Sequence, residues 1–491
     1  MKNKFYITTA IDYVNAAPHI GHAYEKICAD VLARWHRLLG EDVFFLTGTD
    51  ENASKNLEAA KKAKIPAKQF VDKNSIKFQE LCKKLNISND DFIKTTEQRH
   101  VKVAQSIFKK VYDKGDIYKT FYGGYYCSGC EAFLTEKNLV NGKCPEHNEE
   151  PKWLKEESYF FRLSKYKDKI ISLLKSKNFV IPEDKKNEMI NRILKEDLKD
   201  LSVSRVNLEW GIPTSIDPKH RIYVWFDALI NYISALDYPN GSKFKKYWPA
   251  DVHLIGKGIT WFHSVIWPSM LISAEIKTPK TIYVHGYINL RGKKISKSSG
   301  EIVDPLELVD KYGIDPLRYF LIREIPFGED GDFFEEALKT RLNNELANEL
   351  GNLLSRTLTL VEKNFTKVEK TKIDSELSKE LDLNKINDYI KKYELHNSLS
   401  EIFRFISLCN KYVNDNKPWE MKDKEKLNKI LYNLLESLRI ISILLSPFIP
   451  ETSNRINKQL NIKSGLLKDC KLGLVKEYKI KKAEILFKKI N

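Results

Sequence analysis

The sequence predicts an α/β protein in which a Rossmann-like parallel-sheet domain carries an insertion and is followed by an all-α helix-bundle domain. Three observations predict this class. Short apolar segments alternate with amphipathic ones over the first part of the chain and again after about residue 220, a glycine- and cysteine-rich stretch interrupts them, and helical spacing prevails beyond about residue 335. The length of 491 residues also exceeds that of one ordinary core, so several units are expected.

The composition is that of a folded protein without a membrane segment. Hydrophobic residues make up 42% and charged residues 30% of the chain, which excludes long disordered regions. No apolar run approaches the roughly 18 residues that span a bilayer, and no secretory signal precedes the first strand, so we expect a cytoplasmic protein with no membrane partner. The net charge of +16 suits a polyanionic partner, although lysines spread over solvated helix faces would give the same value.

The first unit of the sheet is a strand, a turn and a helix. Phe5 to Ile11 is an apolar run typical of a buried strand, and residues 12–18 form the turn that leaves it. From His19 to Leu39, apolar residues recur at helical spacing, and Gly40 follows as a stop. Val43 to Leu46 predicts the next strand.

The later elements continue this alternation until the helical part begins. Helices are predicted at 68–85, 100–114, 228–236 and 262–274, and strands at 222–225, 253–255 and 281–284. Amphipathic stretches at 336–364, 376–415 and 423–446 predict the helix bundle. The expected units are the two halves of the sheet domain at 1–117 and 220–290, the insertion at 118–219, a lysine-containing loop and linker at 291–345, and the helical domain at 346–491.

The segment His19-Ile20-Gly21-His22 lies where the first strand gives way to its helix. Free backbone N–H groups and the positive end of the helix dipole favour a phosphate at this place, and Gly21 allows a nucleotide to approach closely. The imidazoles of His19 and His22 add hydrogen-bond donors for the same phosphate. Taken alone, the two histidines are also compatible with simple capping of the helix.

A second segment, Lys294-Ile295-Ser296-Lys297-Ser298, lies between two glycines. Two lysines in such a loop form a mobile cationic clamp suited to a leaving pyrophosphate, although a loop of this kind in isolation is usually only solvated. In this order the two segments resemble the HIGH and KMSKS signatures of class I aminoacyl-tRNA synthetases, with Ile295 in place of methionine. The resemblance implies that His19, His22, Lys294 and Lys297 are catalytic, and that ATP is bound by His19, Gly21, His22, Lys294, Lys297 and Ser298.

Three further segments resemble the methionyl-tRNA synthetase family. Residues 10–22 are similar to its first-strand loop, with Asp12 where proline is often found, and residues 222–232 and 255–268 are similar to the segments that build its amino-acid pocket. The resemblance implies that Asp50 takes the ammonium group of L-methionine, and that the side-chain pocket is lined by Ile11, Tyr13, Trp225, Ala228, Leu229, Tyr232, Ile259 and His263. Aromatic faces suit a polarizable thioether, and a carboxylate is the natural partner of an ammonium group.

One position in the third of these segments departs from the family. Gly258 stands where an acidic residue is common, between a lysine and an isoleucine. A glycine offers no side chain, so the contact that the acidic residue makes to the ribose of ATP is in doubt in this chain.

The insertion contains the pattern Cys127-x2-Cys130-x13-Cys144-x2-His147. Four ligands at this spacing close a tetrahedral site, which predicts one structural Zn²⁺ per chain, and Gly129 and Gly142 suit the tight turns. The pattern resembles the single zinc knuckle of one subgroup of the same family, and a thiol cluster without metal is the alternative. The other cysteines are expected to be isolated buried thiols, namely Cys28, Cys82, Cys409 and Cys470.

Two segments of the helical part resemble the family's anticodon-reading motifs, Asn352-Leu353-Leu354-Ser355-Arg356 and Asn416-Lys417-Pro418-Trp419. The resemblance implies that tRNA(Met), including the initiator, is a partner and that its anticodon is bound by Asn352, Arg356, Pro418 and Trp419. The indole would stack on an unpaired base, while a buried Trp419 that only fills the core is the plain alternative. The sequence lacks the dimerising domain that some relatives append, so a monomer is expected.

The resemblance further implies a two-step ligase reaction. The methionine carboxylate attacks the α-phosphate of ATP, whose charge is shared with Mg²⁺, and the 2′-hydroxyl of the tRNA then attacks the methionyl-adenylate. Three alternatives remain open. A class I synthetase for cysteine, leucine or valine should lack the set of Trp225, Tyr232 and His263. A small-molecule nucleotidyltransferase would not need the Trp419 motif, and a non-catalytic descendant should have lost His19, His22 or Lys297.

Overall fold

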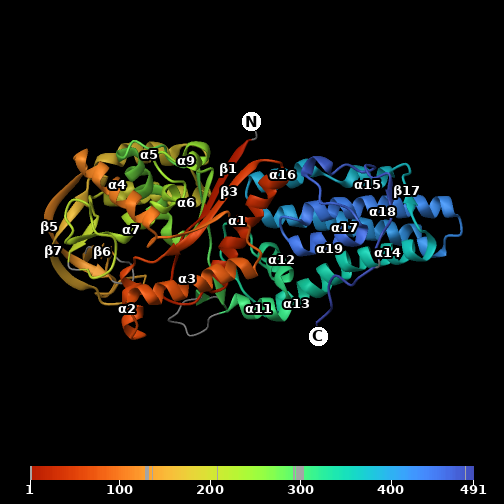
Figure 1. Cartoon of the computed structure of the whole chain (residues 1–491), viewed down its shortest axis with the longest axis horizontal. Helices are drawn as coiled ribbons and strands as arrows, with labels where there is room; N and C mark the ends of the chain where they lie inside the picture. The colour runs from red at the N-terminus through yellow and green to blue at the C-terminus, as the bar shows by residue number, and fades with distance from the viewer. Residues whose placement is uncertain are drawn as a thin grey trace.

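The structure is a computed structural model that describes residues 3–127, 132–134, 136–146, 148–206, 208–290, 293–294, 303–481 and 483–490. The molecule is elongated, with a sheet-containing half at one end and a helical half, formed by the C-terminal part of the chain, at the other (Figure 1). This arrangement confirms the predicted α/β class with a following all-α part. No helix in the described part of the chain is long and apolar enough to cross a bilayer.

A seven-stranded parallel sheet forms the centre of the first half. Its strands follow the order β2-β3-β1-β12-β13-β8, and β4 also pairs with β3. The bounds are Lys4–Thr9 for β1, Asp12–Tyr13 for β2, Asp42–Asp50 for β3, Asp91–Lys94 for β4, Val180–Ile181 for β8, Val252–Gly256 for β12 and Thr281–His285 for β13. Since the chain leaves β1 toward β3 and returns later to β12 on its other side, the carboxyl end of β1 is a switch point, where open α/β sheets bind ligands.

Helices cover both faces of this sheet. As a result, alternate residues of β1 belong to different apolar clusters. Phe5 and Ile7 pack with α1, whereas Tyr6 belongs to the cluster on the opposite face. The helices of this half are α1 (Ile20–Leu38), α2 (Ser54–Lys62), α3 (Ala67–Lys84), α4 (Gln98–Asp113), α7 (Val224–Ala228), α8 (Asn231–Ser234), α9 (Ser242–Tyr247), α10 (Trp267–Ser273), α11 (Pro305–Tyr312) and α12 (Ile314–Glu324), with the shorter turns η3 (Lys257–Ile259) and η4 (Phe262–Ile266).

The expected insertion forms an antiparallel sheet of the order β6-β5-β7-β9, beside two helices. Its elements are β5 (Ile117–Cys127), β6 (Ala132–Leu134), η1 (Glu136–Asn138), β7 (Lys152–Phe161), η2 (Leu163–Tyr166), α5 (Lys167–Lys175), α6 (Glu183–Glu196) and β9 (Leu201–Ser202). Between α5 and α6, however, β8 joins the main parallel sheet, where Val180 pairs with Ile282. The insertion therefore contributes an edge strand to the sheet that it interrupts.

One predicted strand is wrong. Residues 222–225 were expected to form a strand of the parallel sheet, but β11 (His220–Ile222) ends there and pairs antiparallel with β10 (Ser204–Val206) outside that sheet. Val224 then begins the short helix α7. The segment is buried on all sides, so its apolar run carries no periodicity that separates a strand from a helical turn.

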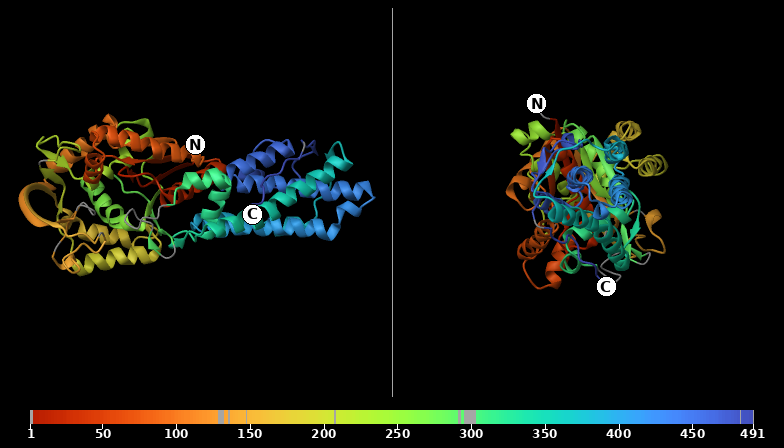
Figure 2. Two further views of the ribbon diagram at one scale, coloured as in Figure 1. Left: turned by 90° about the horizontal axis from the view of Figure 1, so that it is seen from below. Right: turned by 90° about the vertical axis from the view of Figure 1, so that its right-hand side faces the viewer.

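The helical half consists mainly of long antiparallel helices that run along the molecule (Figure 2). Its helices are α13 (Glu335–Arg341), η5 (Leu342–Gly351), α14 (Asn352–Asn364), α15 (Ser375–Glu380), α16 (Leu383–Lys391), α17 (Leu395–Asn416), η6 (Pro418–Glu420), α18 (Lys424–Leu445), α19 (Pro450–Leu460) and η7 (Leu467–Asp469). Two short strands, β17 (Val368–Glu369) and β18 (Glu477–Tyr478), pair beside them, and β14 (Ile288–Leu290), β15 (Lys293–Lys294) and β16 (Gly331–Asp332) form a small sheet nearer the middle of the molecule.

Arg318 of α12 joins the two halves. Its fully buried guanidinium donates to Asp30 of α1 at 2.7 Å, to the carbonyl of Leu85 after α3 at 3.0 Å, and to the carbonyls of Pro447 and Phe448 between α18 and α19 at 3.0 and 2.8 Å. Burial acts to raise the pKa of Asp30, but the guanidinium outweighs it and holds that pKa below its usual value. Removing one partner of such a pair leaves a buried charge or buried carbonyls without a partner.

We expect Arg318→Met to destabilise the protein by about 3–5 kcal/mol, because it removes one of the two arginines paired with the buried Asp30 and deprives the carbonyls of Leu85, Pro447 and Phe448 of this donor. Lys84→Met provides the control, because its partner Asp310 lies 3.8 Å away and both side chains are more than half exposed, so the change should cost about 1 kcal/mol or less. Thermal unfolding of both variants checks this. Equal shifts in Tm would show that Arg318 does not hold the halves together.

Candidate active site

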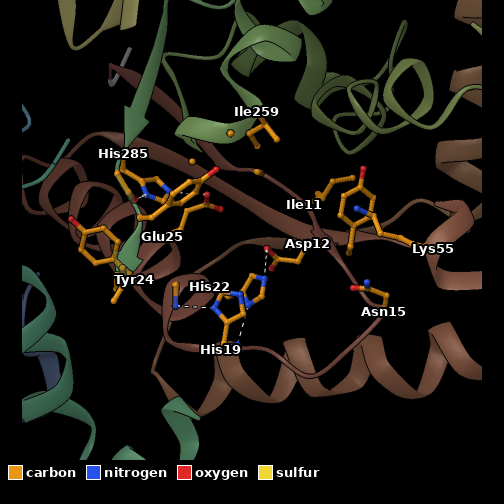
Figure 3. Close-up of a pocket in the computed structure, with 18 of the residues that line it drawn as sticks. Ile11, Asp12, Asn15, His19, His22, Tyr24, Glu25, Lys55, Ile259 and His285 are labelled. Atoms are coloured by element: carbon orange, nitrogen blue, oxygen red, sulfur yellow. Dashed lines mark hydrogen bonds and ion pairs between the residues drawn. The ribbon is translucent and has the colours of Figure 1, made fainter. Parts of the chain in front are cut away.

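A cleft opens at the carboxyl ends of β1 and β12, where the sheet has its switch point (Figure 3). Its cavity measures about 320 Å³, within the roughly 300–1,000 Å³ typical of small-molecule sites. The walls come from the loop after β1, the first turns of α1, the turn after β12 and the segment after β13, and they comprise Ala10, Ile11, Asp12, Tyr13, Asn15, His19, Gly21, His22, Tyr24, Glu25, Lys55, Trp225, Gly256, Gly258, Ile259, His285, Gly286, Tyr287 and Ile288.

The two histidines cap α1 and face this cleft. The backbone N–H of Gly21 donates to Nδ1 of His19 at 3.1 Å, and the backbone N–H of His19 donates to Nδ1 of His22 at 3.0 Å. Because each Nδ1 accepts a hydrogen bond, each neutral ring carries its own proton on Nε2, which makes Nε2 the donor for a ligand. The rings lie 3.8 Å apart between centroids. Capping thus uses Nδ1 of each ring and leaves Nε2 for a ligand.

Gly21 also makes room for a side chain of the protein. A Cβ at this position would lie 2.9 Å from Cε1 of His19, so glycine lets the His19 ring fold back over the helix start. The close approach of a nucleotide to Gly21, which lines the cleft, stays a prediction.

A buried ion pair lies beneath the histidines. Nζ of Lys26, with no exposed surface, bonds to Asp12, and the other carboxylate oxygen of Asp12 lies 3.9 Å from Nε2 of His22. Burial acts to lower the pKa of Lys26, but Asp12 and Glu25 outweigh it and raise that pKa. The ammonium of Lys26 offsets the negative charge that Asp12 brings to this wall of the cleft.

All nine residues expected to bind methionine line one narrow cavity that adjoins the cleft: Ile11, Tyr13, Asp50, Trp225, Ala228, Leu229, Tyr232, Ile259 and His263. They come from β2, the end of β3, α7, α8, η3 and η4. The ring of Trp225 stacks on Phe262 at 3.8 Å and 9°, and Tyr13 meets Trp225 edge-on at 6.2 Å. The cavity is therefore apolar and aromatic with one carboxylate, that of Asp50, at its border.

Tyr232 and His263 form the polar end of this cavity. Nδ1 of His263 lies 3.0 Å from the carbonyl of Ile259 and therefore carries the proton, which leaves Nε2 to accept from the Tyr232 hydroxyl at 2.7 Å. Burial lowers the pKa of His263 to about 4, so the ring is neutral at physiological pH. Both groups are fixed by each other and present no charge to the ligand.

The comparisons with known proteins agree with this geometry. The family model described as tRNA synthetases class I (M) matches residues 5–153 and 147–358, and that of the anticodon-binding domain of tRNA ligase matches residues 373–487. The methionine–tRNA ligase of Caldanaerobacter subterraneus subsp. tengcongensis is 48% identical over 100% of this chain and 80% of its own, and that of Clostridium acetobutylicum is 45% identical over 100% and 79%. The chain belongs to the methionyl-tRNA synthetase family.

Solved structures of the methionyl-tRNA synthetase from Mycobacterium tuberculosis share the fold of this synthetase. The structure bound by methionyl-adenylate is 37% identical, covers 99% of this chain and 100% of its own, and has a TM-score of 0.95. The apo form is 35% identical, covers 100% and 99%, and has a TM-score of 0.89. The arrangement of this synthetase is thus more similar to the adenylate-bound structure than to the free one.

The lysine loop of the synthetase lies largely outside the described residues. Lys297 and Ser298 are not described, whereas the backbone of Lys294 pairs with Asn289 of β14. Because β14 follows directly from the cleft-lining segment 285–288, the loop begins next to the cavity.

Two of the four expected zinc ligands are described. Cys127 at the end of β5 and Cys144 are each 1% exposed, whereas Cys130 and His147 lie outside the described residues. Gly142 has φ +75°, which fits the tight turn expected before Cys144. The remaining cysteines are all buried, as predicted, at Cys28, Cys82, Cys409 and Cys470.

The expected anticodon residues of the synthetase meet at one end of the helical half. Asn352 and Arg356 of α14 line a hollow shared with Asn410 and Asn414 of α17. Arg356 donates to Asn414 at 3.0 Å, and its guanidinium lies 5.3 Å from the ring centre of Trp419. Trp419 is 49% exposed, so it does not fill the core, whereas Pro418 is buried in the same turn, and its part in anticodon binding stays a prediction.

Sequence reasoning missed several cleft residues. Phe262 supports Trp225 from behind, Lys55 places Nζ 3.4 Å above the ring of Tyr13, and Glu25 and Lys26 follow the histidine motif by one turn. Phe262 lay inside a segment already matched to the family. The others had no signal, because one charged residue on a helix is usually a solvated one.

The neutral state of His263 predicts a pH dependence of stability. Its folded pKa of about 4 lies below the unfolded value near 6.5, so between these pH values the unfolded chain binds the extra proton, and stability is lost as the pH falls from about 6.5 to about 4. His263→Gln, which still offers an acceptor to Tyr232, should show a smaller drop in Tm between pH 7 and pH 5 than the parent protein. His253, whose pKa burial also lowers, accounts for part of the slope that remains. An unchanged slope would contradict the assignment.

Proposed function

We propose that the cleft activates L-methionine with ATP and that the adenylate formed there is transferred to tRNA(Met), with the expected site residues in the roles named above. The observation that carries this proposal is the placement of an aromatic cavity with one carboxylate directly beside the capped end of α1. An amino acid in the cavity would direct its carboxylate toward a phosphate held at the helix end.

Each group then has a definite part in adenylate formation. Nε2–H of His19 and His22 would donate to the α-phosphate region, and Lys294 and Lys297 would stabilise the departing pyrophosphate. Asp50 would hold the substrate ammonium. Mg²⁺ carried by ATP neutralises part of the triphosphate charge when bound. The protein supplies position and charge and forms no covalent intermediate.

The direct test is ATP–pyrophosphate exchange with methionine, leucine, isoleucine, valine and cysteine. Exchange driven mainly by methionine supports the proposal. A preference for another amino acid would show that the cavity does not select methionine. No exchange with any of the five amino acids would favour a non-catalytic role.

Lys297→Ala should lower the rate of methionyl-adenylate formation by roughly 10²-fold or more while methionine affinity stays within about threefold, because the lysine acts on charge that develops in the transition state. Single-turnover kinetics and equilibrium binding of methionine measure the two quantities. Comparable losses in both would show that Lys297 is not part of the clamp. Lys293→Ala is the matched control, because it removes another lysine, the one that precedes Lys294 in β15.

Trp419→Ala should weaken aminoacylation of tRNA(Met) by roughly 10-fold or more and leave methionine-dependent exchange unchanged, because loss of one base-stacking contact costs about 1–3 kcal/mol and the loop between α17 and α18, which carries the residue, lies in the helical half, away from the sheet (Figure 1). Exchange and aminoacylation assays on the same preparation separate the two effects. If aminoacylation keeps its full rate, the indole does not read the anticodon.

The zinc knuckle is also part of the proposal. Cys127, Cys130, Cys144 and His147 would hold one Zn²⁺, and the buried thiols of Cys127 and Cys144 are suitable soft donors for it. The metal would order the tip of the β5–β7 hairpin and take no part in the chemistry. The division into the five units given above, the monomeric state and the cytoplasmic location remain proposals of the same kind.

A further inference from the structure

Asp227 of α7 lies behind the methionine cavity, the narrow cavity lined by the nine residues named above, and its side chain is fully buried. Trp225 lines this cavity from the same helix. Residues two positions apart on a helix differ by about 200° in direction, so Asp227 is directed away from the cavity where Trp225 is directed into it. The carboxylate of Asp227 is therefore available to hold parts of the protein and not to bind a ligand.

Both oxygens of this carboxylate are bonded to other buried side chains. Nε2 of His100, on α4, lies 2.6 Å from Oδ1, and Nδ2 of Asn52, in the segment after β3, donates to Oδ2 at 2.8 Å. Because an ionised carboxylate only accepts, Nε2 of His100 carries the proton of the first bond. Nδ1 of the same ring, which has no exposed surface, lies 2.8 Å from the Ser234 hydroxyl of α8. The network thus connects α4, α7 and α8 to the segment after β3.

Asn52 extends this network to Asp50, the carboxylate expected to hold the substrate ammonium. The backbone N–H of Asn52 donates to Oδ1 of Asp50 at 3.2 Å, and its side chain also donates to the carbonyl of Thr95 at 3.1 Å. Asp50 is the last residue of β3 and lines the methionine cavity. Since one residue binds both carboxylates, a shift of Asp227 displaces the donor that orients Asp50.

We propose that Asp227 is a positioning residue for methionine recognition, which is held by His100, fixes Asn52 and thereby directs the carboxylate of Asp50 toward the substrate ammonium. The inference rests on the proposed function, because that function gives Asp50 this contact. A buried residue that touches no substrate then determines how strongly the cavity prefers a ligand with an ammonium group.

The test compares L-methionine with 4-(methylthio)butanoate, which has the same side chain and carboxylate but lacks the ammonium group. Equilibrium titrations of the full chain give the Kd of each ligand. Asp227→Asn should weaken methionine binding by about 10- to 100-fold and leave the Kd of the acid within about threefold, because the amide turns an N–H toward a donor of His100 or Asn52 and releases the residue that orients Asp50. Equal weakening of both ligands, or no change in either, would overturn the inference.

Asp116→Asn is the matched control. Asp116 is a fully buried aspartate of the same half, and it accepts from Lys165 of η2 at 2.5 Å and from Ser273 of α10 at 2.8 Å. The control variant should lose stability in thermal unfolding but keep the ratio of the two Kd values within about threefold, because its partners do not reach the segment after β3. A change of this ratio as large as that in Asp227→Asn would show that loss of any buried carboxylate has the effect, and the inference would fall.

Two variants of His100 remain informative if Asp227→Asn folds poorly. His100→Leu removes the donor to Asp227 and should lower the preference for methionine over the acid by about 10-fold or more. His100→Gln offers an amide N–H to the same carboxylate and should keep that preference within about threefold of the parent value. The same loss in both variants would contradict a role of this hydrogen bond.

A double-mutant cycle shows whether Asp227 acts through Asp50. Asp50→Asn should itself remove most of the preference for methionine, and in this background Asp227→Asn should change the preference by about threefold or less. Additive effects would overturn the inference. If Asp50→Asn keeps the full preference, the role of Asp50 in the proposed function fails. If Asp50→Asn loses the preference and Asp227→Asn does not, the inference fails and the proposed function stands.

Discussion

Helix α1 is buried on almost every side, with 14 of its 19 residues covered, and three of these are charged. A charge in such a place must have a partner, because leaving it unpaired costs several kcal/mol. Glu25 is bonded to His285, Lys26 to Asp12 and Asp30 to Arg318. These pairs fix the helix against the end of β13, against β2 and against α12, whose Arg318 also contacts the helical half. The same constraint that allows α1 to be buried therefore also determines the geometry of the cleft at its first turn.

This arrangement connects the two halves of the synthetase through one buried guanidinium. The first turn of α1 presents the histidines, and its middle accepts Arg318, which also contacts the turn between α18 and α19. The loop between α17 and α18, which carries Trp419, lies at the end of the helical half away from the sheet (Figure 1). The joint at Arg318 therefore connects the helix that presents the histidines to the half that carries this loop.

Much of this could be predicted from the sequence, and the failures have identifiable causes. The histidine motif, the helix at 19–39 and the strands at 253–255 and 281–284 follow from local periodicity and from motif order, and the structure places them as expected. The strand predicted at 222–225 is a helical turn because a fully buried segment has no polar face to set its period. The addition of β8 to the main sheet and the pairing of Asp12 with Lys26 depend on contacts between distant segments. Single charged residues in a sequence do not reveal such contacts.

In the cleft, too, some features could be predicted from the sequence and others depend on the fold. Residues implied by family resemblance, such as Trp225, Tyr232 and His263, lie around one cavity, but their protonation and stacking are set by neighbours such as the Ile259 carbonyl and Phe262. Gly258 is a clear departure in the sequence, but only the fold shows that the Tyr287 hydroxyl, from the segment between β13 and β14, lies where a side chain of residue 258 would start. The structural effect of a glycine in place of a larger residue can therefore be judged only from the fold.

The most direct test of the whole account is an experimental structure of the synthetase with a hydrolysis-resistant analogue of methionyl-adenylate. We predict the methionine side chain between Trp225 and Tyr232, and the phosphate mimic beside Nε2 of His19 and His22. An analogue bound with its nucleotide away from the start of α1, or with its side chain outside the cavity, would contradict the account.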